Sequence, residues 1–163
     1  MSTIIDTLIT NRTHSDVERV RELAAKWFAA MTAVEQAEWL AGMKGAYNAA
    51  DLNRVGTALN YLAARLISIC GRSIAWTAKT DWAVTDIPSA SQAETYRRQI
   101  QDIRDALAYP AGTPDAPQLG RLTYTDANNI ERILKLCEDL IVNVAKSFRH
   151  TGAAECAAGG LLT

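Results

Sequence analysis

The sequence predicts an all-α protein: a bundle of about five helices, with an extended arm that carries tryptophans and a C-terminal tail of small residues. Its 163 residues suit one domain with a buried core, and 48% apolar against 21% charged residues is the balance of a globular chain. Apolar residues recur at three- and four-residue steps in five segments, which is the period of a helix face. We therefore expect one helical domain over residues 1–150 and a tail over residues 151–163.

The first two expected helices, residues 16–31 and 33–43, are separated by a break near Met31. Ser15-Asp16-Val17-Glu18 and Thr32-Ala33-Val34-Glu35 both place a hydroxyl side chain three residues before a glutamate, which is the capping-box pattern of a helix start. Apolar residues follow each box at helical spacing. The chain is therefore expected to begin its second helix at a new angle.

The third expected helix covers residues 49–70. Asn48 can cap its first turn, and Gly71 is suited to its C-terminal stop. Gly56 lies inside this helix, where glycine costs about 1 kcal/mol relative to alanine. A close helix crossing at Gly56 would explain why a glycine is present.

Residues 72–88 are expected to form an extended arm. Apolar and other side chains alternate from Ser73 to Ala78, which is the period of a strand, and Pro88 disfavours helical geometry at Ile87. A helical bundle does not need such a segment to close its core. We therefore predict that the arm, the tail or both contact another subunit, and the arm residues predicted to form this interface are Trp76, Trp82, Val84 and Ile87.

Two other roles for the arm tryptophans stay open. They could pack the arm onto the bundle, because an indole has a large apolar surface. Alternatively, Trp76 and Trp82 beside Asp81 and Asp86 could bind a sugar, and a pair of carboxylates can hydrolyse one.

The last two expected helices cover residues 92–108 and 126–149. Ser91-Gln92-Ala93-Glu94 is a third capping box, and the proline-rich residues 109–117 predict a loop between the two helices. The core is expected to contain apolar residues of the third, fourth and fifth helices, among them Val55, Leu59, Leu62, Ile103, Ile133, Leu140 and Ile141.

Two of the helix starts are alike, at residues 47–55 and 124–133. Each has a tyrosine, a side chain that can cap a helix, an Asp or Asn, and an arginine beside a β-branched residue. We therefore predict that these two helices occupy similar places in the bundle, as the closing helices of two related halves.

Charge and composition favour a binding role over catalysis. A net charge of −1 gives no field that attracts nucleic acid or an anionic membrane, and no apolar run approaches the roughly 20 residues of a membrane span. No Gly-rich phosphate loop, His-Glu-x-x-His or paired Cys-x-x-Cys occurs. We predict no enzyme activity, no catalytic residue, no cofactor, no metal site, and no nucleic-acid or membrane partner.

The remaining reactive side chains have ordinary expected roles. Cys70, Cys137 and Cys156 are an odd number of widely spaced cysteines, so all three are expected to be free thiols. His14 and His150 are expected to be solvated residues at helix ends.

Three arginines, Arg97, Arg98 and Arg104, alternate with acidic and amide residues in the fourth expected helix. Mixed charges at this spacing are typical of a solvated face with local ion pairs. A patch that binds nucleic acid would need uncompensated charge.

Several stretches in a fixed order cover most of residues 1–150. They are Ile9-Thr10-Asn11-Arg12-Thr13 with Asp16-Val17; Met31-Thr32-Ala33 with Glu38-Trp39-Leu40; Lys44-Gly45-Ala46-Tyr47-Asn48-Ala49-Ala50-Asp51-Leu52-Asn53-Arg54-Val55-Gly56; Thr80-Asp81-Trp82 with Asp86-Ile87-Pro88; and Tyr124-Thr125. Together they resemble a family of virion-structural proteins encoded near the tail and tail-fibre genes of temperate phages and prophages of Gram-positive bacteria. Arg149-His150-Thr151-Gly152 matches the aromatic, Gly-containing end of that family only loosely.

The resemblance implies a non-enzymatic structural protein of the tail tip, baseplate or fibre attachment, which assembles with other virion proteins and with copies of itself. The N-terminus lacks a basic region followed by an apolar core, so we expect synthesis in the host cytoplasm and a final location in the virion. Two alternatives stay open: a carbohydrate-binding tail module that uses Trp76 and Trp82, and a non-viral helical adaptor or DNA-associated regulator.

Overall fold

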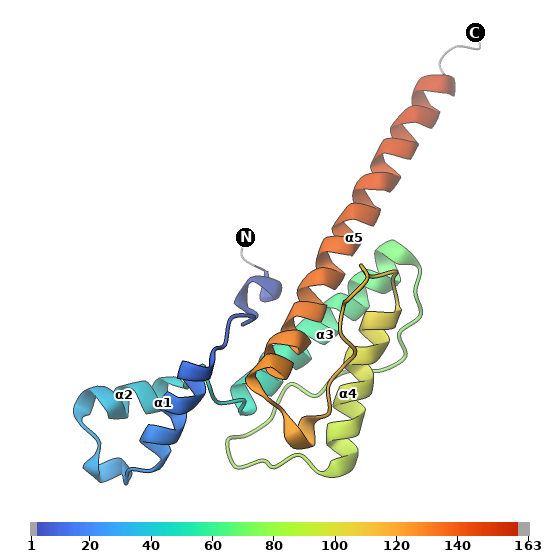
Figure 1. Ribbon diagram of the computed structural model, residues 1–163. Coiled ribbons are helices and arrows are strands. Elements are labelled where there is room, and N and C mark those ends of the chain that lie inside the picture. The colour runs from blue at the N-terminus through green and yellow to red at the C-terminus, as the bar shows by residue number, and fades with distance from the viewer. Residues whose placement is uncertain (1–2, 160–163) are drawn as a thin grey trace.

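The computed structural model describes residues 3–159, with side chains described for residues 3–148, and this part of the chain is all-helical without strands, as predicted. The elements in chain order are η1 (Ile4–Thr7), α1 (His14–Ala24), η2 (Phe28–Ala30), α2 (Ala33–Ala41), α3 (Ala49–Cys70), α4 (Ala90–Asp105), η3 (Leu119–Arg121) and α5 (Tyr124–Gly159), where η denotes a short 3-10 helix. Helices α3, α4 and α5 pack on one another as a bundle, and η1 lies against α3 and α5. Helices α1 and α2 lie to one side of this bundle (Figure 1).

The core lies between α3, α4 and α5. Val55, Leu59 and Leu62 of α3, Ile103 of α4, and Ile133 and Ile141 of α5 are all buried, which confirms those predictions. Leu140 is only partly buried, so its assignment to the core was wrong. Because consecutive residues turn by about 100° around a helix, Leu140 lies about 60° from buried Cys137, at the margin of the apolar face.

Helix starts follow the predicted capping chemistry, but α1, α4 and α5 each begin two residues earlier than predicted. Helix α1 is capped by Thr13 with Asp16, and α4 by Ser89 with Gln92, instead of by Ser15 and Ser91. Both sequences contain two overlapping boxes, and the earlier one is used. The predicted box at Thr32 and the predicted cap at Asn48 are confirmed.

Two helix ends differ from prediction by more than a few residues. Helix α1 ends at Ala24 instead of Met31, because the chain turns there and continues as η2 before α2. Helix α5 continues through Gly159, so residues 151–159 are helical instead of an irregular tail; alanine, abundant there, has the highest helix propensity. Cys156 and His150 lie outside the described side chains, and residues 160–163 lie outside the described residues.

The arm of residues 72–88 is extended, as predicted, but it is fastened to the bundle. Asn53 accepts a hydrogen bond from the Trp82 N–H (2.7 Å) and donates one to the Trp82 carbonyl (2.9 Å). Asn60 forms the same pair with Ala78, at 2.7 and 3.0 Å. Gly56 lies between these two asparagines, and a Cβ there would overlap the Lys79 carbonyl oxygen. The reason for Gly56 is therefore the arm, and not the helix crossing that we expected.

The two similar helix starts are not structurally equivalent. Aligned on their capping residues, Asn48 of α3 corresponds to Thr123 of α5, and Asp51 corresponds to Asp126. The tyrosines and arginines then fall out of register. Helix α4 packs against α5, whereas α2 does not pack in this way along α3. The likeness is shared capping chemistry, and the prediction of two related halves was wrong.

Candidate functional site: a clasped hairpin and its apolar surface

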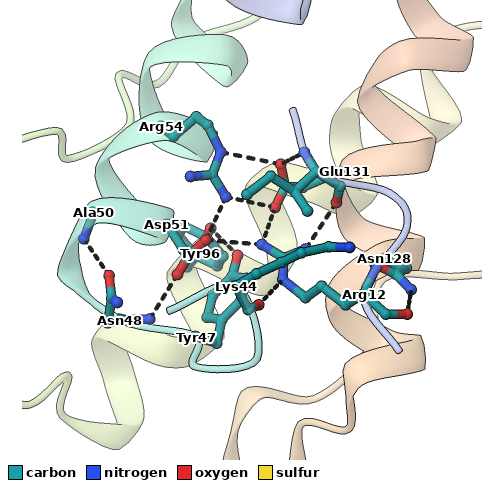
Figure 2. Close-up of polar contacts among 11 residues, drawn as sticks. Arg12, Lys44, Tyr47, Asn48, Ala50, Asp51, Arg54, Tyr96, Asn128 and Glu131 are labelled. Carbon is teal, nitrogen blue, oxygen red and sulfur yellow. Dashed lines mark hydrogen bonds and ion pairs between the residues drawn. The ribbon is translucent and has the colours of Figure 1, made fainter. Parts of the chain in front are cut away.

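A buried arginine joins four separate parts of the chain (Figure 2). One terminal nitrogen of Arg12, Nη2, donates to Asp51 (2.8 Å) on α3 and to Glu131 (2.6 Å) on α5. Nη1 donates to the Ile9 carbonyl (2.8 Å), and Nε donates to the Lys44 carbonyl (3.1 Å). The Arg12 side chain is only 1% exposed, so each of these bonds is shielded from water.

Glu131 is the anionic centre of this network and is fully buried. Its Oε1 accepts from Arg12 and from Arg54 (2.9 Å), and its Oε2 accepts from Arg54 Nε (3.2 Å) and from the Ile9 N–H (2.5 Å). Arg54 also donates to Asp51. Burial opposes the charge of Arg54, but the bonds and attraction to Glu131 and Asp51 outweigh it and raise its pKa. Two arginines and two carboxylates together leave no net charge inside the protein.

Two tyrosines close the network on the side of α4. The Tyr47 and Tyr96 hydroxyls are 2.8 Å apart and hydrogen-bonded, and the Arg12 guanidinium lies over the Tyr47 ring at 5.6 Å from its centroid. Burial raises the pKa of both phenols, so both stay neutral and can serve as hydrogen-bond partners.

Residues 3–13, here called the strap, are held on α3 and α5 beside this network. Ile5 and Leu8 are buried in the core. Asn128 of α5 accepts from the Arg12 N–H and donates to the Arg12 carbonyl, both at 2.9 Å. This is the arrangement by which Asn53 and Asn60 hold the arm. Asn53, Asn60 and Asn128 therefore each bond to both the N–H and the carbonyl of one extended residue. Together they fasten the chain to the bundle at three points.

The same network fixes the base of the hairpin, which we define as residues 14–41 with α1 and α2. The chain leaves the bundle at Thr13 and returns near Lys44, and Arg12 bonds to the Lys44 carbonyl between these points. Gly45 approaches α1 so closely that a Cβ would overlap the Asp16 carbonyl. A hollow of about 350 Å³, lined in part by Val17 and Tyr124, separates α1 from the start of α5. Arg12 thus acts as a clasp at the hairpin base.

Ion pairs join the two sides of the hairpin. Arg19 of α1 donates to Glu38 of α2 (2.7 Å), and Lys26 donates to Glu35 (2.5 Å). The bond from Lys26, with those from Thr32, lowers the pKa of Glu35 to about 2. Leu23 of α1 is fully buried. The charged groups of the hairpin named here are satisfied within it.

Large apolar side chains of the hairpin remain in solvent. Trp27 is 86% exposed, Phe28 46%, Val34 76% and Leu40 74%. We call Trp27 and Phe28, in the turn between α1 and α2, the hairpin tip. Single exposed apolar residues are ordinary, but several on one small unit indicate a surface that contacts another molecule.

A neutral groove lies at the opposite end of α2 and has a volume of about 480 Å³. The hairpin contributes Trp39 and Leu40, and the turn that follows it contributes Met43. The start of α3 contributes Ala49 and Ala50, and the arm contributes Val84. No charged side chain lines it among the described residues. This groove joins the hairpin and the arm into one apolar surface.

The structure divides the four arm residues that were predicted to form an interface. Val84 and Ile87 are 96% and 90% exposed, so they are free to contact a neighbour. Trp82 is buried in the core of its own chain, because the bonds from Asn53 draw this part of the arm onto α3. Trp76 is partly buried, packs against the core, and donates to Asp102 (2.8 Å).

Sequence reasoning missed both the clasp and the hairpin surface. Trp27 and Phe28 lie within residues 16–31, which were expected to form one helix. Arg12 and Asp51 lie inside the stretches that carry the family resemblance, and that is the one signal that could have directed attention to them.

The other charged and reactive groups carry no site. Arg97 and Arg98 both pair with Glu94, and Arg104 pairs with Asp105 and Asp115, which confirms local ion pairing. Cys70 and Cys137 are free thiols, as predicted. In the described part of the chain no cluster of three or more His, Cys, Asp or Glu side chains could hold a metal ion, and no helix could cross a membrane.

Comparisons with protein-family models, with curated proteins and with solved structures find no match for this chain.

Proposed function

We propose that the protein is a non-enzymatic structural component of a bacteriophage particle, at the tail tip, baseplate or fibre attachment, where it assembles with other virion proteins. The observation that carries this proposal is the apolar surface of the hairpin and groove. It is exposed, it lies outside the core, and the charges around it are already paired within the chain. Such a surface favours a protein partner bound by apolar contact.

The buried network supports the same role. An assembly module has to present its surface in a fixed direction, and Arg12 ties both ends of the hairpin to α3 and α5. Buried charges that are fully hydrogen-bonded can give an arrangement its uniqueness even where they add little net stability. The stretches that carry the resemblance include residues 9–13 of the strap, short parts of the hairpin, and the first two turns of α3, so they contain Arg12 and Asp51.

The sugar-binding alternative has less support than the assembly role. Stacking on a sugar requires open indole faces, and Trp82 is buried. Asp81 pairs with Lys79, and Asp86 accepts from the Ala83 N–H, so each carboxylate already has a partner within the arm.

The test is the composition of the particle. Purified particles encoded by the genome that carries this gene should contain the chain in fixed stoichiometry by quantitative mass spectrometry. Deleting the gene should yield particles that lack its neighbouring components. Particles that are complete and infective without the chain would reject the proposal, and would favour a helical adaptor outside the virion.

A further inference from the structure

We infer that the hairpin tip of one copy of this chain occupies the apolar groove of a second copy. This inference deepens the proposed assembly role and rests on it for its biological setting. The contact joins different surfaces of two identical chains. One chain contributes Trp27 and Phe28, and the other contributes the groove between α2, α3 and the arm.

The first argument is that the tip and the groove match in chemistry and size. Trp27 is 86% exposed, and the groove is lined by apolar and neutral side chains such as Trp39, Leu40 and Met43. A hollow of about 480 Å³ falls within the roughly 300–1,000 Å³ of sites that enclose a drug-sized group. An indole with its neighbouring phenyl ring is a group of that kind.

The second argument is that the tip cannot fill the groove of its own chain. Trp27 and Phe28 precede α2, whereas Leu40 and Met43 lie at its C-terminal end. The nine-residue helix between them is about 13 Å long and holds the two surfaces apart. A tip that enters this groove must therefore come from a second copy of the chain.

The third argument is electrostatic. The chain carries a net charge of −1, so copies do not repel each other strongly. Lys26, next to the tip in sequence, is paired with Glu35, and Arg19 of α1 is paired with Glu38. The tip therefore brings no unpaired charge from these residues into a groove that has no charged lining. A nucleic acid, an anionic membrane or a charged peptide would find no partner there.

A contact between unlike surfaces has a distinctive consequence. A chain without a working tip and a chain without a working groove each lose self-association, but together they retain one intact contact. Identical patches that pair face to face do not behave in this way.

The experiment is sedimentation velocity of the purified full-length chain over a range of concentrations, with three variants. Trp27→Asp disables the tip, and Leu40→Asp with Val84→Asp disables the groove. Ile67→Asp is the matched control, because Ile67 is 50% exposed and lies on α3 away from both surfaces. Circular dichroism checks the fold of each variant. If a charged variant is unfolded, the uncharged Trp27→Ala and Ala50→Trp replace it.

We expect the wild type and Ile67→Asp to self-associate alike, and the tip and groove variants to associate at least about tenfold more weakly, as is usual when an anchor residue is lost. An equimolar mixture of the tip and groove variants should restore a dimer. A monomeric wild type, undiminished association in either variant, or a mixture that stays monomeric would each overturn the inference. Because only the purified chain is used, such a failure is distinct from failure of the particle-composition test.

Discussion

Replacing Glu131 with glutamine tests whether the buried network holds the strap and hairpin base in place. Glu131 is fully buried and accepts from Arg12, from Arg54 and from the Ile9 N–H. The amide of glutamine carries no charge, so two arginines would share the single carboxylate of Asp51. Breaking a buried ion pair from one side costs about 3–5 kcal/mol, because an uncompensated charge stays buried.

The assay is urea unfolding followed by far-ultraviolet circular dichroism. With a denaturant slope of about 2 kcal/mol per molar, the loss corresponds to a midpoint about 1.5–2.5 M lower. Glu138→Gln is the matched control on the same helix: Glu138 pairs with Arg65 at 3.1 Å but is partly exposed, and burial raises its pKa. That substitution should cost less than about 1 kcal/mol.

A double variant separates the charge effect from packing. Arg12→Met with Glu131→Met removes one cation and one anion together and leaves Arg54 paired with Asp51. Its loss of stability should be clearly smaller than the sum of the two single losses, because neither charge is left without a partner. The reasoning is refuted if Glu131→Gln is no more harmful than Glu138→Gln, or if the two methionine substitutions are additive.

Three further predictions concern the core, the hairpin and a buried thiol. Leu62→Ala should lower the free energy of unfolding by about 2–5 kcal/mol, because Leu62 is fully buried. Leu140→Ala should lower it clearly less, because Leu140 is only partly buried. Equal losses in urea unfolding would contradict the core described here. The pKa of Glu35 is lowered from 4.5 to about 2 by its bonds to Lys26 and Thr32, so the stability it gives is complete above pH 4.5 and is lost as the pH falls toward 2. The protection of α2 amides against hydrogen exchange, measured relative to the intrinsic exchange rate at each pH, should therefore fall over that interval in the wild type. A Glu35→Gln variant with the same pH dependence would show that another group is responsible. Burial raises the pKa of Cys137 to about 11, so brief alkylation at pH 8 followed by peptide mapping should leave Cys137 unmodified and modify the half-buried Cys70; labelling of both to the same extent would mean that the core opens readily.

The helices could be predicted because their starts depend on neighbouring residues. Asn48 and Gly71 are strong local signals, and α3 begins and ends where they indicate. The starts of α1 and α4 were misplaced by two residues, because each sequence offers two capping boxes and local chemistry does not choose between them. Alternation in residues 73–78 correctly predicted an extended arm.

The clasp could not be predicted, because it joins residues that are distant in sequence. Arg12 is separated from Asp51 by 39 positions and from Glu131 by 119, and each of these side chains is ordinary in its own segment. Asp51 has a complete local explanation as the third residue of a capped helix. Only the packing of α3 against α5 brings the carboxylates to the arginine.

The apolar surface was sought in the arm and lies mostly in the hairpin, for a related reason. Tryptophans in an extended segment suggest an interface, but Asn53 binds the backbone of Trp82 and buries its side chain. Trp27 continues a helical pattern that predicts burial, yet α1 ends at Ala24 and leaves it in solvent. Periodicity indicates which residues share a face, but not whether another element covers that face.

Cryo-electron microscopy of the particle encoded by the genes around this one tests the central claim most directly. The claim is that this chain is a virion component whose hairpin and groove are its assembly surface. The account predicts density for the bundle of α3, α4 and α5 in the particle, with Trp27 and Leu40 buried against a neighbouring subunit. A particle without such density, or one in which both side chains face solvent, would contradict it.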